Sequence, residues 1–133
     1  TKHWFLHSTL YSALKMISKQ KATVIITTDH GSIRVNRASQ LIGDKETTTT
    51  IRYKQGKNLS FNEKHAFSMK DPEEYGLPVR NIVDNYVFAK DDYYFVYPNM
   101  FHQYQKQFNG TFQHGGISME EMILPVAVCS PKK

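Results

Sequence analysis

The fold of this chain is decided by the stretch VIITTDHG at residues 24–31. Its first part is short and almost entirely apolar or β-branched, which is typical of a strand that helices cover on both faces of a parallel sheet. The strand ends in Asp29 and His30, and Gly31 gives the backbone freedom to turn directly afterwards. We therefore expect an α/β fold with these polar side chains at the carboxyl edge of a sheet, where such folds bind ligands.

The residues before this strand predict a helix. Leu6, Leu10, Leu14 and Ile17 recur at intervals of three and four, which gives the apolar stripe of a helix lying on a sheet. A helix followed at once by a strand is half of a βαβ unit whose first strand is not in the chain. We therefore expect the chain to be the carboxyl-terminal piece of a larger fold, whether natural or excised.

Residues 32–60 follow a different pattern. Residues 32–36 and 48–54 alternate between apolar and polar types, and turn-forming residues lie around 43–44 and 55–58. This pattern predicts an antiparallel β excursion, at about residues 32–60, that is inserted after the strand and is not part of the main sheet.

The second half of the chain predicts mixed elements. Residues 85–89 and 93–97 are rich in aromatic and β-branched types and flank a short polar turn, which indicates a hairpin. Residues 101–108 keep helical spacing up to a plausible stop. The sequence SMEE at 118–121 matches a capping box that begins a short helix, and residues 124–128 predict a last strand.

Composition limits the classes of protein to which the chain can belong. With 133 residues, 40% of them hydrophobic, the chain is one domain's worth and can bury a core. It contains no apolar run of about 18 residues and no secretory signal pattern, so we expect no membrane span. Cys129 is the only cysteine, which favours a reducing compartment and hence the cytoplasm. The net charge of +5 includes a basic stretch that would attract phosphate groups or form an ordinary solvated face.

A second motif, HGG at residues 114–116, raises the possibility of a metal site. Carboxylate and imidazole groups are suitable ligands for zinc or manganese, so Asp29, His30 and His114 are the candidate metal ligands. Two glycines after a histidine let the backbone approach a bound ion or anion closely. The alternative reading is structural, with Asp29 as a cap, His30 as a packed neutral ring and His114 in a flexible loop.

These residues, taken together, resemble a known family. The chain contains TTDHG at 27–31, RYKQGKN at 52–58, YVFAK at 86–90 and FQHGGISMEEMILP at 112–125. In this respect it resembles the carboxyl-terminal third of the alkaline phosphatase superfamily. It is most similar to the PglZ-type branch, and within it to the effector domain of the response regulator that controls type IX secretion. The resemblance runs over residues 1–133 and implies part of an α/β/α sandwich.

The resemblance also implies roles for the candidate residues. In the superfamily two metal ions, usually zinc, lie roughly 4 Å apart and clamp both ends of a phosphoryl displacement. By position, Asp29 and His30 resemble ligands of one ion and His114 resembles a ligand of the other. We infer that Arg52, Lys54 and Lys57 grip a substrate phosphate. The nucleophile and the remaining ligands belong to the amino-terminal part of that fold, so the isolated chain is expected to have little or no activity.

Three hypotheses about function follow. In the first, the chain is part of a zinc-dependent phosphodiesterase or phosphatase that acts on nucleotide-like phosphoesters. The missing amino-terminal part would complete this enzyme, and an upstream receiver domain would control it. The second is a non-catalytic module whose basic residues bind nucleic acid or a partner protein. The third is a signalling scaffold in which the old enzyme core forms a homodimer.

Overall fold

The computed structural model of the chain describes residues 1–44, 49–79 and 85–131. Its helical elements are α1 (Lys2–Leu6), α2 (Thr9–Ile17), the 3-10 turns η1 (Pro72–Tyr75) and η2 (Pro98–Met100), α3 (Phe101–Phe108) and α4 (Met119–Met122). Its strands are β1 (Val24–Ile26), β2 (Ile33–Arg34), β3 (Arg37–Ile42), β4 (Tyr53–Gly56), β5 (Ser60–Phe61), β6 (Ala66–Met69), β7 (Asn85–Ala89), β8 (Tyr93–Val96), β9 (Phe112–Gln113) and β10 (Ala127–Cys129). The chain therefore mixes helices and strands, as the sequence predicts for an α/β protein.

The chain divides into two compact units. The first comprises Thr1–Asp29 and Leu124–Lys133, and we call it the ribbon unit. The second comprises His30–Ile123, and we call it the body. In the part of the chain that the structure describes, no helix is long and apolar enough to cross a membrane.

The ribbon unit consists of α1, α2 and the two strands β1 and β10. The predicted single helix is in fact two helices, because the Oγ atom of Ser8 accepts a hydrogen bond from the backbone N–H of Tyr11 (3.1 Å) and begins α2. α2 does pack toward the strands, since Leu14 and Ile17 line a groove of about 400 Å³ together with Val24 and other residues of the ribbon.

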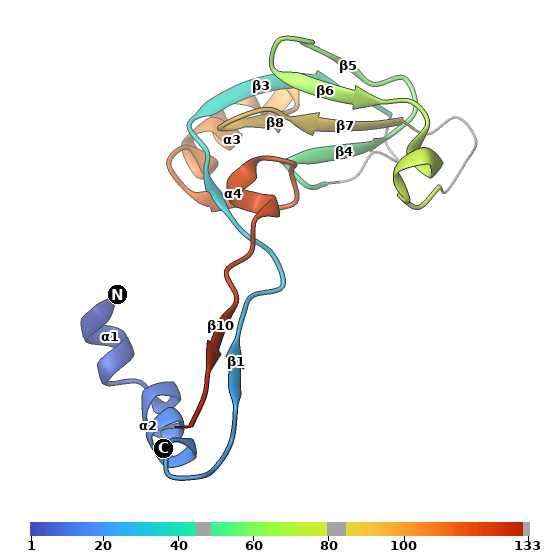
Figure 1. The fold of residues 1–133 in the computed structure, drawn as a ribbon. Helices are drawn as coiled ribbons and strands as arrows, with labels where there is room; N and C mark the ends of the chain where they lie inside the picture. The colour runs from blue at the N-terminus through green and yellow to red at the C-terminus, as the bar shows by residue number, and fades with distance from the viewer. Residues whose placement is uncertain (45–48, 80–84, 132–133) are drawn as a thin grey trace. The chain divides into compact units, whose positions relative to one another are not determined.

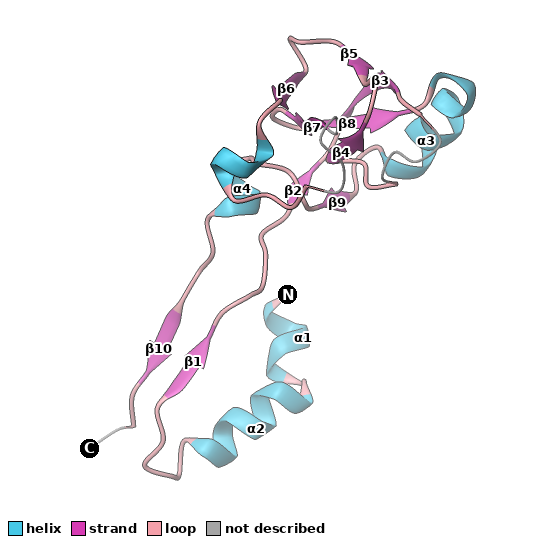
Figure 2. Ribbon diagram, turned by 90° about the vertical axis from the view of Figure 1, so that its right-hand side faces the viewer, coloured by secondary structure: helices cyan, strands magenta, loops and turns pink. Residues whose placement is uncertain are grey.

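The partner of β1 differs from the expectation of a parallel sheet. β1 pairs with β10 in an antiparallel register that sets Ile25 opposite Val128 (Figures 1 and 2). Both side chains are largely exposed, at 64% and 63%. The prediction that helices cover both faces of this strand is therefore wrong for the described residues, and the apolar run of β1 faces solvent on one side.

The body is built on two three-stranded sheets. One has the order β5-β3-β8, with β3 parallel to β8 and antiparallel to β5. The other has the order β4-β7-β6 and is antiparallel throughout (Figure 1). The strands expected to form a separate excursion at about 32–60 thus pair with strands outside that range, namely β7, β8 and β9. Within the predicted strand at 48–54, β4 begins only at Tyr53, and Thr48 lies outside the described residues.

The hairpin predicted for residues 85–97 does not form as a ladder. β7 lies between β4 and β6, so both of its hydrogen-bonding edges are occupied, and β8 pairs with β3 in the other sheet. The turn between them is held by the backbone N–H of Tyr93, which donates to the carbonyl of Lys90 (3.0 Å), and by Arg37, which binds the carboxylate of Asp92. The turn therefore passes the chain from one sheet to the other.

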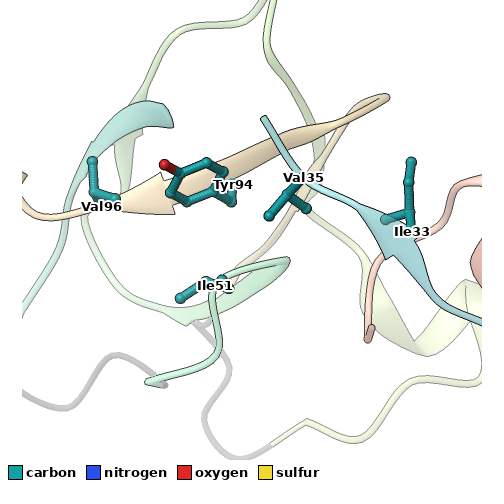
Figure 3. Packing of buried hydrophobic residues seen from close by; sticks show 5 residues of the cluster. All are labelled: Ile33, Val35, Ile51, Tyr94 and Val96. Atoms are coloured by element: carbon teal, nitrogen blue, oxygen red, sulfur yellow. The ribbon is translucent and has the colours of Figure 1, made fainter. Parts of the chain in front are cut away.

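Alternation along β8 produces the core. Tyr94 and Val96 belong to a buried cluster with Ile33, Val35 and Ile51 (Figure 3). Phe101, Tyr104 and Phe108 of α3 pack against this cluster. Phe95, which points to the other side of the strand, joins a second buried cluster with residues of β3, β6 and β7. The predicted helix at 101–108 is confirmed, and so is the short helix that begins after Ser118 in a capping box.

Candidate functional site

The short ladder between β2 and β9 brings the two predicted histidine motifs together. β2 pairs antiparallel with β9, with Ile33 opposite Gln113, and Figure 2 shows the two strands side by side. Backbone hydrogen bonds extend the same ladder to Val35 and Thr111 (3.0 Å). His30 lies just before β2 and His114 just after β9, so the antiparallel register sets them at the same end of the ladder.

The imidazole rings of His30 and His114, which we call the histidine pair, stack on each other. Their centroids are 3.9 Å apart and the ring planes differ by 14°. The Nδ1 atom of His30 lies 2.9 Å from the carbonyl oxygen of Gly31. A carbonyl oxygen can only accept, so this contact is a hydrogen bond in the tautomer that carries its proton on Nδ1 and its lone pair on Nε2. This is the form in which a histidine binds a metal ion.

Asp29, the third predicted ligand, is exposed and accepts a hydrogen bond from the Oγ1 atom of Thr28 (3.4 Å). It is the last residue of the first segment of the ribbon unit, whereas His30 is the first residue of the body. Among residues 1–44, 49–79 and 85–131, no group of three or more His, Cys, Asp or Glu side chains is arranged to hold a metal ion. Within the body, the structure thus brings the two predicted histidines together.

Arg52, predicted to bind phosphate, is instead fully buried in an ion pair. Its Nε and Nη2 atoms donate to the two carboxylate oxygens of Glu121 at 2.9 and 2.6 Å, and its Nη1 atom donates to the carbonyl of Tyr93. The side chains of Arg52 and Glu121 are only 0% and 2% exposed. This two-pronged geometry is the strong form of an arginine–carboxylate contact.

Lys54 and Lys57, the other predicted phosphate ligands, have different surroundings. Lys54 is buried, and its Nζ atom lies 4.7 Å from the centroid of the Tyr97 ring. Burial disfavours the charged ammonium and lowers the pKa of Lys54 to about 8. Lys57 is half-exposed, so it is the most accessible of the three predicted cations.

Glu121 is a functional candidate that sequence reasoning placed in a capping box and in the family motif but did not assign to the site. Its Oε1 atom accepts the backbone N–H of Gly116 (2.9 Å), and its Oε2 atom accepts the N–H of Ser118 (3.2 Å). Burial alone would raise the pKa of this carboxyl, but the hydrogen bonds from Arg52 and Gly116 and the charge of Arg52 outweigh it. The pKa of Glu121 is therefore held below its ordinary value.

The glycines of the two motifs are explained by close approach within the chain. A Cβ atom on Gly116 would lie 2.6 Å from Oε2 of Glu121, and one on Gly31 would lie 2.0 Å from the carbonyl oxygen of Glu120. Gly115 has a φ of +97°, which side chains rarely adopt. From the sequence we expected these glycines to leave room for a bound ion. In the structure they leave room for Glu121 and the backbone beside it.

Comparison with known families agrees with the resemblance to the PglZ-type branch. The profile of the BREX system PglZ alkaline phosphatase-like domain matches residues 7–129, so the chain belongs to this PglZ family. The comparison with curated proteins found no match.

Proposed function

We propose that the chain is the carboxyl-terminal part of a metal-dependent phosphoric ester hydrolase domain with the α/β/α sandwich of the alkaline phosphatases. In this proposal Asp29 and His30 bind one zinc ion and His114 binds a second, with manganese as an alternative metal. The observation that carries the proposal is the stacking of His30 on His114 at 3.9 Å in a chain of the PglZ family. Two neighbouring histidines can each reach one of two ions that lie roughly 4 Å apart, because a zinc–nitrogen bond is about 2 Å long.

The donor chemistry of these residues fits zinc. A carboxylate and two imidazoles supply the oxygen and nitrogen ligands that zinc accepts, and the contact between His30 Nδ1 and the Gly31 carbonyl favours the tautomer whose Nε2 can bind a metal ion. When bound, such ions stabilise the charge on the attacking and leaving oxygens of a phosphoryl displacement. Within this chain the two histidines would act as ligands. The nucleophile and the remaining ligands would come from the amino-terminal part of the domain.

The proposed substrate is a nucleotide-like phosphodiester or phosphomonoester. Of the three cations predicted to contact the substrate phosphate, Arg52 and Lys54 are buried. In this proposal Lys57 is therefore the residue that contacts the phosphate. The resemblance to the regulator of type IX secretion supports a finer proposal, in which the domain is the cytoplasmic effector of a two-component response regulator and is controlled by an upstream receiver domain. The burial of the same two cations counts against the alternative of a basic nucleic-acid-binding module, which needs its charges at the surface.

Metal binding by the chain itself tests the proposal. Zinc titration by calorimetry should detect binding to the wild-type chain. His30→Ala and His114→Ala should each weaken the affinity for zinc at least tenfold, and Asp29→Ala should also weaken it. His102→Ala is the matched control, since His102 is an exposed histidine on α3 of the same body. If the wild-type chain binds zinc no better than the histidine variants, or if all variants behave like His102→Ala, the proposal is wrong. With zinc bound, hydrolysis of bis(p-nitrophenyl) phosphate in the complete protein should depend on the same residues.

A further inference from the structure

Glu121 of the Arg52–Glu121 ion pair hydrogen-bonds to the segments that carry the histidine pair. A buried ion pair is a costly way to gain stability, because both charges lose their hydration and their attraction often only compensates for this loss. The geometry here is nevertheless close to ideal, with two short hydrogen bonds and almost no exposure of either side chain. We therefore ask which segments of the chain this ion pair holds in place.

Glu121 contacts both histidine segments. On one side, its main-chain carbonyl accepts the N–H of Gly31 (3.0 Å), the residue next to His30. On the other side, its carboxylate accepts the N–H of Gly116 and that of Ser118, in the loop that follows His114. A single residue thus hydrogen-bonds to both segments, with its main-chain carbonyl to one and its carboxylate to the other.

Arg52 fixes the carboxylate that makes this connection. Four N–H donors surround the two carboxylate oxygens, two from Arg52 and two from the loop. The backbone at Gly31 and at Gly116 packs so closely against Glu120 and Glu121 that neither position has room for a side chain. The β2–β9 ladder sets His30 and His114 at one end, and the hydrogen bonds of Glu121 are a second constraint on the loops that carry them. The planar fork of the Arg52 guanidinium holds the carboxylate of Glu121 in place for these bonds.

We propose that Glu121, oriented by Arg52, is the positioning residue for the histidine pair. It touches neither ring directly in the contacts described above and acts through the backbone on each side of the pair. Its effect on metal binding rests on the proposed function, whereas its effect on ring stacking does not. Outer groups of this kind typically change metal affinity by roughly 10- to 100-fold when they are altered.

The main test compares Arg52→Lys with Arg37→Lys in the full chain. Arg52→Lys keeps the charge but removes the fork, and Arg37→Lys makes the same change in the half-exposed ion pair with Asp92. Two quantities are measured: the cross-peak between the imidazole protons of His30 and His114 by NMR, and the affinity for zinc. We expect Arg52→Lys to lose the cross-peak and about 10- to 100-fold in affinity while its backbone spectrum remains folded. Arg37→Lys should change neither.

A second pair of variants serves if Arg52→Lys does not fold. Ser118→Pro removes the N–H that Glu121 accepts, and the φ of Ser118, −69°, already suits proline. Ser118→Ala keeps that N–H and controls for loss of the hydroxyl. Ser118→Pro should weaken the cross-peak and the zinc affinity several-fold relative to Ser118→Ala.

The outcomes separate the two proposals. If the cross-peak survives in folded Arg52→Lys, or Ser118→Pro equals Ser118→Ala when Arg52→Lys does not fold, the positioning role is overturned. If the cross-peak responds as expected but the wild-type chain binds no zinc, the positioning role stands and the proposed function fails. If the cross-peak responds but zinc binds every variant equally, Glu121 positions the rings without any role in metal binding, and the proposal is overturned in its functional part.

Discussion

The ribbon and the body use similar residues and differ in what covers them. β1 reads Val-Ile-Ile and β7 reads Asn-Tyr-Val-Phe-Ala, so both strands are dominated by strand-forming apolar types. Val87 in β7 is fully buried, whereas Ile25 in β1 is 64% exposed. The ladder hydrogen bonds are present in both places, but only β7 has a strand on each side and a packed layer on its face.

This difference shows that strand pairing alone does not make a core. A two-stranded ribbon is marginally stable in water, because it buries little apolar surface. The body gains its stability from two buried clusters that share the strand β8, one on each face. We therefore expect the same chemical change to have very different effects in the two units.

The largest expected effect is a leucine truncation placed in each unit. Leu41→Ala in the body removes a side chain that is 1% exposed, and it should lower the free energy of unfolding by about 2–5 kcal/mol. Leu10→Ala makes the same change in α2, where the side chain is 52% exposed, and should cost less than about 1 kcal/mol. Urea unfolding followed by circular dichroism measures both. Equal losses would show that the ribbon unit has a core as effective as that of the body.

The elements that the sequence predicted well are those set by local pattern. The helix at 101–108 follows from its spacing, and the helix after Ser118 follows from a capping box four residues long. The hairpin at 85–97 and the separate excursion were mispredicted because alternation shows that a segment is a strand but not which strand it pairs with. Both edges of β7 were already taken by strands distant in sequence.

The candidate site likewise has one part that the sequence predicted and one part that it did not. That His30 and His114 meet could be argued from two motifs, each at the edge of a predicted strand or helix. The Arg52–Glu121 pair could not, because its members are 69 positions apart and no periodic pattern links them. Basic residues in one stretch were read as a surface feature, and only the fold shows that Arg52 and Lys54 point into the body.

An intermediate effect is expected from the buried charge of Lys54. Its pKa in the folded state is about 8, below the ordinary value near 10.4, so between these values the unfolded chain binds more protons. The free energy of unfolding should therefore rise with pH across this window, by about 1–2 kcal/mol after allowance for solvent screening. Lys54→Met should lack this rise, and Lys57→Met, at a half-exposed neighbour, should keep it. If the free energy of unfolding depends on pH in the same way in the wild type and in Lys54→Met, the rise does not come from Lys54.

The smallest expected effect is in the ribbon. Ile25→Thr and Val128→Thr replace two facing, exposed side chains with another strand-forming residue, and each should change the free energy of unfolding by less than about 0.5 kcal/mol. Val87→Thr, the matched change in the body, buries a hydroxyl at a fully covered position and should cost about 1–3 kcal/mol. Hydrogen exchange supplies a second readout, because amides of β1 should exchange far faster than those of β7. Strong protection of β1, or a large loss in Ile25→Thr, would mean that a further layer covers the ribbon in solution, and the contrast between the two units would then reflect a missing partner for β1 and β10.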